Sequence, residues 1–177
     1  KQIKPANMFE LSIDQVRAIL CYRPKAKNEP LTGRVLVAPI TVNGELSSVE
    51  LIVESGRKSV IAGGVKAGGC WQPEPIPAEA GAVAIVEGIA TGLSVKAATG
   101  LPVVAALSSG NLVAIAGQIR ANYPAAEIIL CADIAKATGT PDSHAVAAAR
   151  AIGGVLAVPD TSLDEGTDFN DQACARG

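Results

Sequence analysis

Between residues 82 and 160 the chain alternates short apolar runs with longer amphipathic stretches. The apolar runs are AVAIVEG, LPVVAAL, AEIILCAD and VLAVPD. Nearly continuous apolar strands that alternate with helices are typical of a parallel sheet covered on both faces. We therefore predict a four-stranded parallel α/β sheet. The intervening helices are predicted over 89–100, 111–123 and 142–154, the second capped by Asn111 and the third by Asp142 or Ser143.

The pattern before residue 70 is different. Apolar residues at helical spacing predict a helix over residues 12–20, with Ser12 as its N-cap. Residues 33–64 read as antiparallel strands joined by turns at Asn43-Gly44 and Ser55-Gly56. The proline-rich segment WQPEPIPAEAG marks a linker. We predict a small helix plus antiparallel β lobe over 1–76, followed by the parallel sheet domain over 77–177.

Composition narrows the class of protein. No apolar run approaches the ~20 residues of a membrane span, and no signal peptide is recognisable, so we expect a soluble protein without a membrane partner. The four cysteines are far apart and there is a single histidine, His144, which argues against a zinc site or a disulfide scaffold and fits a reducing cytoplasm. Because a covered parallel sheet buries its own core, we expect a monomer.

The net charge of −2 is unevenly distributed. Residues 1–80 hold ten Lys/Arg and eight Asp/Glu, whereas residues 81–177 hold five and nine. A slightly basic lobe beside an acidic one suits a protein that holds a polyanion next to bound cations. Asymmetries of this size are also common by chance.

Three carboxylates follow predicted strands: Glu87, Asp133 and Asp160. Ligands of open α/β sheets bind beyond the carboxyl ends of the strands, so we expect these side chains at one edge. Converging carboxylates repel each other unless a cation neutralises them, and Mg²⁺ is bound through one or two carboxylates plus water and phosphate. The alternative for each residue is that it caps the next helix, although Glu87 is early for that role.

A family resemblance extends over residues 81–172. The segments VAIVEGIATGLSVKAATGLPVVAALSSGNL and EIILCADIAKATGTPDSHAVAAARAIGGVLAVPDTSLDEGTDFND resemble the Toprim domain of primases carried by phages, plasmids and integrating elements. The earlier GRKSVIAGGVKAGGCW resembles the stretch that precedes Toprim in those primases. The resemblance implies a DNA primase core that makes short RNA primers for replication of such elements. It also implies a single-stranded DNA template, ribonucleoside triphosphates and a helicase domain or protein as partners.

The resemblance also assigns site residues. Glu87 corresponds to the family's general acid/base, and Asp133 to the first aspartate of a D-x-D motif that binds Mg²⁺ or Mn²⁺ for nucleotidyl transfer. The second aspartate is replaced by Ala135, which cannot ligate a metal. We expect Asp142, or next Asp160, to substitute as a metal ligand; the alternative is an inactive site.

The segment TDFND resembles the part that closes the Toprim fold. As functional residues, Asp168 and Asp171 would be outer metal ligands. As structural residues, Asn170 and Asp171 would accept hydrogen bonds from loop amides, and we favour this interpretation.

Phosphate-binding candidates lie in the first lobe. Arg57, Lys58 and Lys66 border a glycine-rich stretch that could approach a phosphate or template, although an ordinary solvated turn is the alternative. Neither a P-loop nor a Rossmann fingerprint is present. Trp71 is the one credible residue for base stacking, and His144 has no expected role.

Two other functions use the same residues. A Toprim nuclease would employ the same carboxylates to cut a phosphodiester. A non-catalytic nucleic-acid or partner-binding module, suggested by Ala135, would bind DNA indifferently to Mg²⁺ and to Glu87→Gln.

Overall fold

The computed structural model describes residues 7–160 and 167–176 and forms two compact units. The first unit ends at Gly69 and the second begins at Cys70, a few residues before the boundary predicted at 76/77. Trp71 accounts for this difference. It pairs with Ala105 through two backbone hydrogen bonds of 2.9 and 2.8 Å, so the proline-rich stretch begins inside the second unit.

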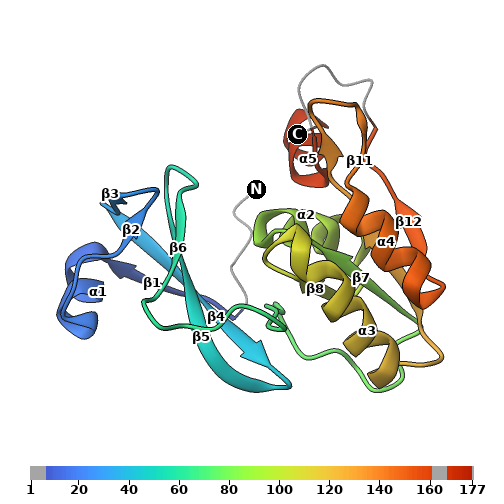
Figure 1. Ribbon diagram of the computed structural model, residues 1–177, viewed down its shortest axis with the longest axis horizontal. Helices are drawn as coiled ribbons and strands as arrows, with labels where there is room; N and C mark the ends of the chain where they lie inside the picture. Colours follow the sequence, from blue (N-terminus) through green and yellow to red (C-terminus); the bar gives the residue numbers. More distant parts are fainter. Residues whose placement is uncertain (1–6, 161–166, 177) are drawn as a thin grey trace. The chain divides into compact units, whose positions relative to one another are not determined.

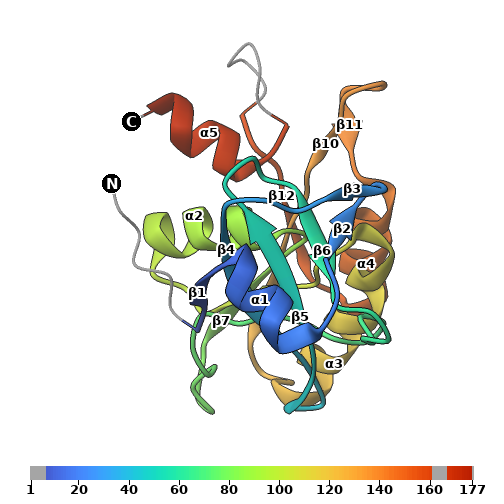
Figure 2. The ribbon, with the colours of Figure 1, turned by 90° about the vertical axis from the view of Figure 1, so that its left-hand side faces the viewer.

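The first unit is built on an antiparallel sheet in the order β1-β4-β5-β6 (Figures 1 and 2). Its elements are β1 (Phe9–Ser12), α1 (Ile13–Leu20), β2 (Lys25–Ala26), β3 (Glu29–Pro30), β4 (Arg34–Val42), β5 (Glu45–Val53) and β6 (Lys58–Val60). The meander that the sequence predicts over 33–64 is therefore present. Strand β1 was not predicted; its residues pair with β4 just before the helix begins.

Helix α1 begins where the sequence predicts. Ser12 and Gln15 form a reciprocal capping box, in which the Gln15 N–H donates to the Ser12 hydroxyl and the Ser12 N–H donates to the Gln15 side chain. Ile13 and Val16 of this helix are buried with Val35 and Leu51 of the sheet. Burial of this apolar face, together with the cap, explains why the short segment is helical.

The β4–β5 turn has the backbone of a tight hairpin. Asn43 and Gly44 have φ values of 51° and 84°, as a type I′ turn requires. The predicted hairpin at these two residues is confirmed.

The second unit is a parallel sheet in the order β12-β9-β7-β8. Its elements are β7 (Ala82–Val86), α2 (Ile89–Thr99), β8 (Val103–Ala105), the 3-10 turn η1 (Ser109–Asn111), α3 (Leu112–Asn122), β9 (Glu127–Cys131), β10 (Ile134–Ala135), β11 (Thr140–Pro141), α4 (Ser143–Ile152), β12 (Val155–Ala157) and α5 (Phe169–Arg176). The predicted four-stranded parallel sheet is confirmed, with its three predicted helices.

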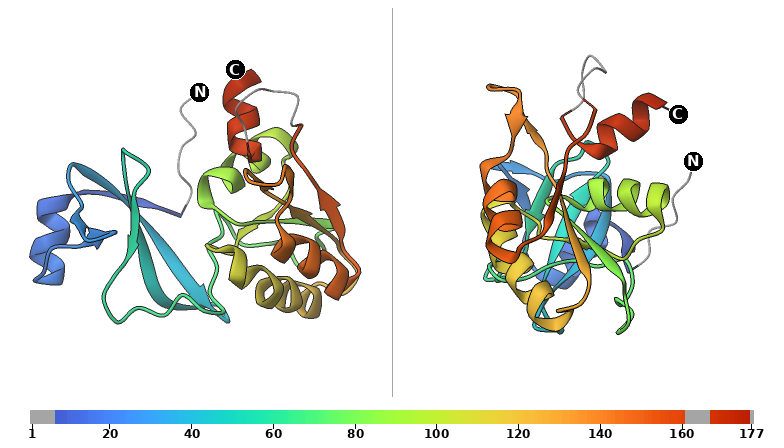
Figure 3. Two further views of the ribbon diagram at one scale, coloured as in Figure 1. Left: turned by 45° about the horizontal axis from the view of Figure 1, so that its top comes forward. Right: turned by 90° about the vertical axis from the view of Figure 1, so that its right-hand side faces the viewer.

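Helices cover both faces of this sheet (Figure 3). On one face, α3 and α4 pack over Val83, Ile85, Ile128 and Leu130. On the other face lie α2 and α5. Within the described residues, no helix has the length and apolarity to cross a membrane.

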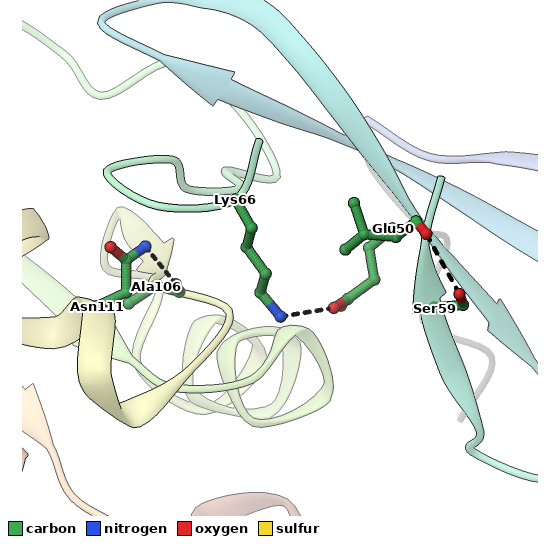
Figure 4. Close-up of polar contacts among 6 residues, drawn as sticks. Glu50, Ser59, Lys66, Ala106 and Asn111 are labelled. Carbon is green, nitrogen blue, oxygen red and sulfur yellow. Dashed lines mark hydrogen bonds and ion pairs between the residues drawn. The ribbon is translucent and has the colours of Figure 1, made fainter. Parts of the chain in front are cut away.

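Two features of the second unit were not predicted. After β9 the chain forms a small hairpin, β10–β11, before α4 begins, and α5 is a further helix. Asn111 also differs from expectation, because its side chain does not cap α3. Its amide instead donates to the Ala106 carbonyl at 2.9 Å (Figure 4).

Candidate metal and nucleotidyl-transfer site

Glu87 lies at the carboxyl end of the central strand β7. It is half-buried, and its carbonyl accepts the Leu107 N–H at 2.7 Å, which ties it to the segment after β8. Gly88, the next residue, is the N-cap of α2. The side chain therefore stands between a buried strand and a helix start, as the sequence predicts.

Asp133 follows the neighbouring strand β9, and its surroundings are acidic. Burial, followed by the charges of Glu87, Asp168, Asp142 and Asp171, raises its pKa from the ordinary 3.8 to about 7. A carboxyl group gains a proton more readily when it is desolvated and faces like charges. The fold thus gathers carboxylates from well-separated segments around Asp133, and we call these five residues the acidic cluster.

One oxygen of the acidic cluster, Oδ1 of Asp133, is a candidate ligand for a cation. Oδ1 of Asp133 is buried and has no hydrogen-bond partner in the described part of the chain. Buried carboxylate oxygens normally have a partner, and a bound cation would supply one. No three Asp, Glu, His or Cys side chains among the described residues are grouped closely enough to hold an ion by themselves. The cluster therefore fits a hard ion bound through one or two carboxylates, with water and phosphate completing its shell.

The β10–β11 hairpin sets where Asp142 lies relative to Asp133. Ala135 pairs with Thr140, and Ile134 pairs with Pro141. One step further, the Asp142 N–H donates to the Asp133 carbonyl at 2.8 Å. The hairpin therefore returns the chain so that Asp142 lies opposite Asp133, while Ala135 is exposed.

Asp142 also caps a helix. Its Oδ1 accepts the N–H groups of His144 and Ala145 at 2.9 and 3.2 Å, which confirms the predicted cap of α4. The His144 ring nitrogen lies 3.4 Å from the same oxygen. Capping holds the Asp142 carboxylate in place while its charge acts on Asp133.

The other proposed substitute has a different environment. Asp160 is exposed, beyond the end of β12, and its N–H donates to the Gln172 side chain at 2.9 Å. Of the two substitutes, Asp142 is the one that the fold places opposite Asp133.

The start of α5 completes the acidic cluster. Asp168 Oδ1 accepts the Asp171 N–H at 2.8 Å, and Asp171 Oδ2 accepts the Thr167 N–H at 2.9 Å. The structural interpretation is thus confirmed for Asp171. Asn170 differs, because it accepts a hydrogen bond from the Ser94 hydroxyl rather than from a loop amide. The sequence also offered Asp168 and Asp171 as outer metal ligands, and the charges of both residues act on Asp133. The T-D-x-x-D spacing is itself a helix-capping pattern.

The basic candidates of the first unit have partners within that unit. Lys66 forms a 3.1 Å ion pair with the buried carboxylate of Glu50 (Figure 4). Arg57 donates to the carbonyls of Glu29 and Pro30 and pairs with the Glu29 carboxylate. Both side chains therefore have structural contacts, whereas Lys58 is exposed on β6.

Trp71 requires a correction. Its indole is fully buried, with an exposed fraction of 0%, and its backbone pairs with Ala105. A ring that is fully enclosed cannot stack on an incoming base. Trp71 was a stacking candidate because the chain has few aromatic residues, but its side chain is packed in the interior.

A basic feature that sequence reasoning missed lies on the β2–β3 hairpin. Arg23, Lys25 and Lys27 are exposed there, and β2 packs against β6, which carries Lys58. The alternation in RPKAK, which places positive charges at every second position, was the available signal.

Comparison with known proteins identifies the class. Residues 82–177 match the Toprim domain family, and the chain belongs to that family. It is 31% identical over 143 residues to the DNA primase TraC of Escherichia coli, a match that covers 76% of this chain and 10% of TraC. The chain thus spans about a tenth of the length of that relative.

A solved structure shares the fold. The primase fragment of the bacteriophage T7 primase-helicase protein matches with a TM-score of 0.53 and 18% identity, over 77% of this chain and 60% of that fragment. The similarity supports the α/β fold.

Proposed function

We propose that this chain is the catalytic core of a DNA primase, which makes short RNA primers on single-stranded DNA by metal-dependent nucleotidyl transfer. Membership of the Toprim family and the similarity to the DNA primase TraC support this assignment. The primers would be used to replicate the DNA of a phage or mobile element. A helicase domain or a separate helicase protein would act together with the primase.

The observation that carries the proposal is the Asp133 carboxylate within the acidic cluster. Its unpartnered buried oxygen and the like charges around it favour a bound cation. When bound, Mg²⁺ or Mn²⁺ would neutralise charge on the transferring phosphate. Asp133 and Asp142 would hold the ion, with Asp160 the less favoured substitute.

Glu87 would be the acid/base group. It lies at the end of the strand next to that of Asp133, and its charge acts on Asp133. In this role Glu87 would accept the proton of the attacking 3′-hydroxyl, which requires hydrogen-bond reach of that oxygen.

Phosphates of the template or nucleotide would contact the basic residues of the first unit. Lys58 and the cations of the β2–β3 hairpin are exposed and suited to backbone contact. Arg57 and Lys66 remain candidates, although an anion would have to compete with their carboxylate and carbonyl partners. Such contacts are independent of base sequence.

The test is primer synthesis on single-stranded DNA with labelled ribonucleotides and Mg²⁺ or Mn²⁺. Glu87→Gln and Asp133→Asn should each abolish the product. Glu127→Gln is the matched control, because Glu127 is an exposed carboxylate at the opposite end of β9. Equal synthesis by Glu87→Gln and the control would contradict the assignment.

The same assay separates two alternatives. Cleavage of the template without primer formation, lost in Asp133→Asn, would indicate a Toprim nuclease. The exposed Ala135 at the D-x-D position favours a non-catalytic binding module, for which DNA binding would be unaffected by Mg²⁺ and by Glu87→Gln.

A further inference from the structure

Two buried hydroxyl groups project from α2 just after Glu87. Thr91 and Ser94 have exposed fractions of 3% and 8%, and they lie one helical turn apart on a helix whose other buried residues include Ile89 and Val95. A buried hydroxyl without a partner is costly, so the partners of these two groups indicate what they do.

Both hydroxyls donate to the start of α5. The Thr91 Oγ1 lies 3.1 Å from Asp168 Oδ2, and the Ser94 Oγ lies 3.0 Å from Asn170 Oδ1. The two bonds connect segments more than seventy residues apart in the chain. They are alike in length and burial, but only the first reaches a charged group.

The Asp168 carboxylate is held at both of its oxygens. Oδ1 accepts the Asp171 N–H, and Oδ2 accepts the Thr91 hydroxyl. Without Thr91, the bond from the Asp171 N–H would be the one left to the carboxylate among the hydrogen bonds of the described residues, and the carboxylate could rotate away from Asp133.

We propose that Thr91 is a positioning residue, which fixes the Asp168 carboxylate in the acidic cluster so that it can act as an outer ligand, through water, of a divalent cation held by Asp133 and Asp142. Glu87 and Thr91 are four residues apart, across the first turn of α2. One short segment thus presents the acid/base group and orients a carboxylate from α5. The inference rests on the proposed metal site and deepens it.

The experiment titrates Mn²⁺ by electron paramagnetic resonance, which detects the free ion and needs no catalytic activity. Thr91→Val keeps the shape and removes the donor, whereas Thr91→Ser keeps the donor. Ser94→Ala is the matched control, because it removes the parallel bond to uncharged Asn170. Loss of a partner that orients a metal ligand typically weakens binding by about 10-fold or more.

We expect Thr91→Val to weaken Mn²⁺ binding by about 10-fold, with Thr91→Ser and Ser94→Ala close to the wild type. In an Asp168→Asn background, Thr91→Val should have no further effect on Mn²⁺ affinity, because its target carboxylate is gone. Unfolding temperatures should fall similarly in Thr91→Val and Ser94→Ala.

Four results would overturn the proposal. Unchanged Mn²⁺ affinity in Thr91→Val, or an equal loss in Ser94→Ala, would make the bond purely structural while leaving the metal site intact. Wild-type protein that binds no Mn²⁺ would refute the metal site itself, and with it this inference. If Thr91→Val does not fold, the Mn²⁺ affinity of Asp168→Asn is the deciding measurement. An affinity equal to that of wild type would show that Asp168 does not contribute to metal binding, which rejects the positioning role of Thr91.

Discussion

Replacement of Asp133 by asparagine should stabilise the metal-free protein at neutral and alkaline pH. The folded state raises the pKa of Asp133 from 3.8 to about 7, so the folded chain binds more protons than the unfolded chain between these values. The free energy of unfolding therefore falls as the pH rises through this interval, and the whole destabilisation by ionised Asp133 is present above pH 7. Asparagine has nearly the same shape and carries no charge at any pH.

The size of the effect follows from the shift. A change from 3.8 to about 7 corresponds to at most about 4 kcal/mol. Asp133 is only partly buried, so solvent screening reduces this value, and we expect about 1–2 kcal/mol. For a chain of this length, that corresponds to a rise in unfolding temperature of about 2–8 °C.

The assay is thermal unfolding of wild type and Asp133→Asn in EDTA across pH 4–8. The stability advantage of the variant should be largest at pH 8 and close to zero at pH 4. Glu127→Gln, in which the removed charge is exposed at the other end of β9, should show no such trend. A variant that is equally stable or less stable than wild type at pH 8 would refute the raised pKa of Asp133, which burial and then the charges of the acidic cluster cause.

Three further predictions concern other parts of the chain. Asp142→Asn should weaken Mn²⁺ binding, and adding Ala135→Asp should restore it, because in the proposed site Asp142, which the hairpin places opposite Asp133, supplies the ligand that an aspartate at position 135 would otherwise give. Failure of the second change to rescue binding would contradict this substitution. Lys58→Ala should lower affinity for single-stranded DNA and reduce the salt slope by about 0.7, measured by fluorescence anisotropy. Trp71→Ala should cost about 3–5 kcal/mol of stability, measured by urea unfolding; unchanged stability with lost DNA binding would instead favour stacking.

Much of the second unit could be predicted because its strands are buried on both faces. Burial makes a parallel strand a continuous apolar run, so the strands around Val86 and Cys131 were recognisable, and each is followed by its acidic residue. The topology rule for α/β sheets then placed Glu87 and Asp133 at one edge without any knowledge of contacts.

The remaining features depend on contacts between distant segments. Whether Trp71 is exposed is decided by its pairing with Ala105, which no local pattern encodes. The proximity of Asp168 to Asp133 depends on hydrogen bonds from α2 to α5. The hairpin that brings Asp142 opposite Asp133 has strands of only two residues each, too short for any periodicity.

The most direct test of the account is the position of a bound ion. Crystals grown with Mn²⁺ should show an anomalous peak beside Oδ1 of Asp133, with the Asp142 carboxylate among its neighbours and metal–oxygen distances of about 2.1 Å. A peak elsewhere, or none at Mn²⁺ concentrations that support primer synthesis, would contradict the central claim that the carboxyl edge of the parallel sheet is a metal site.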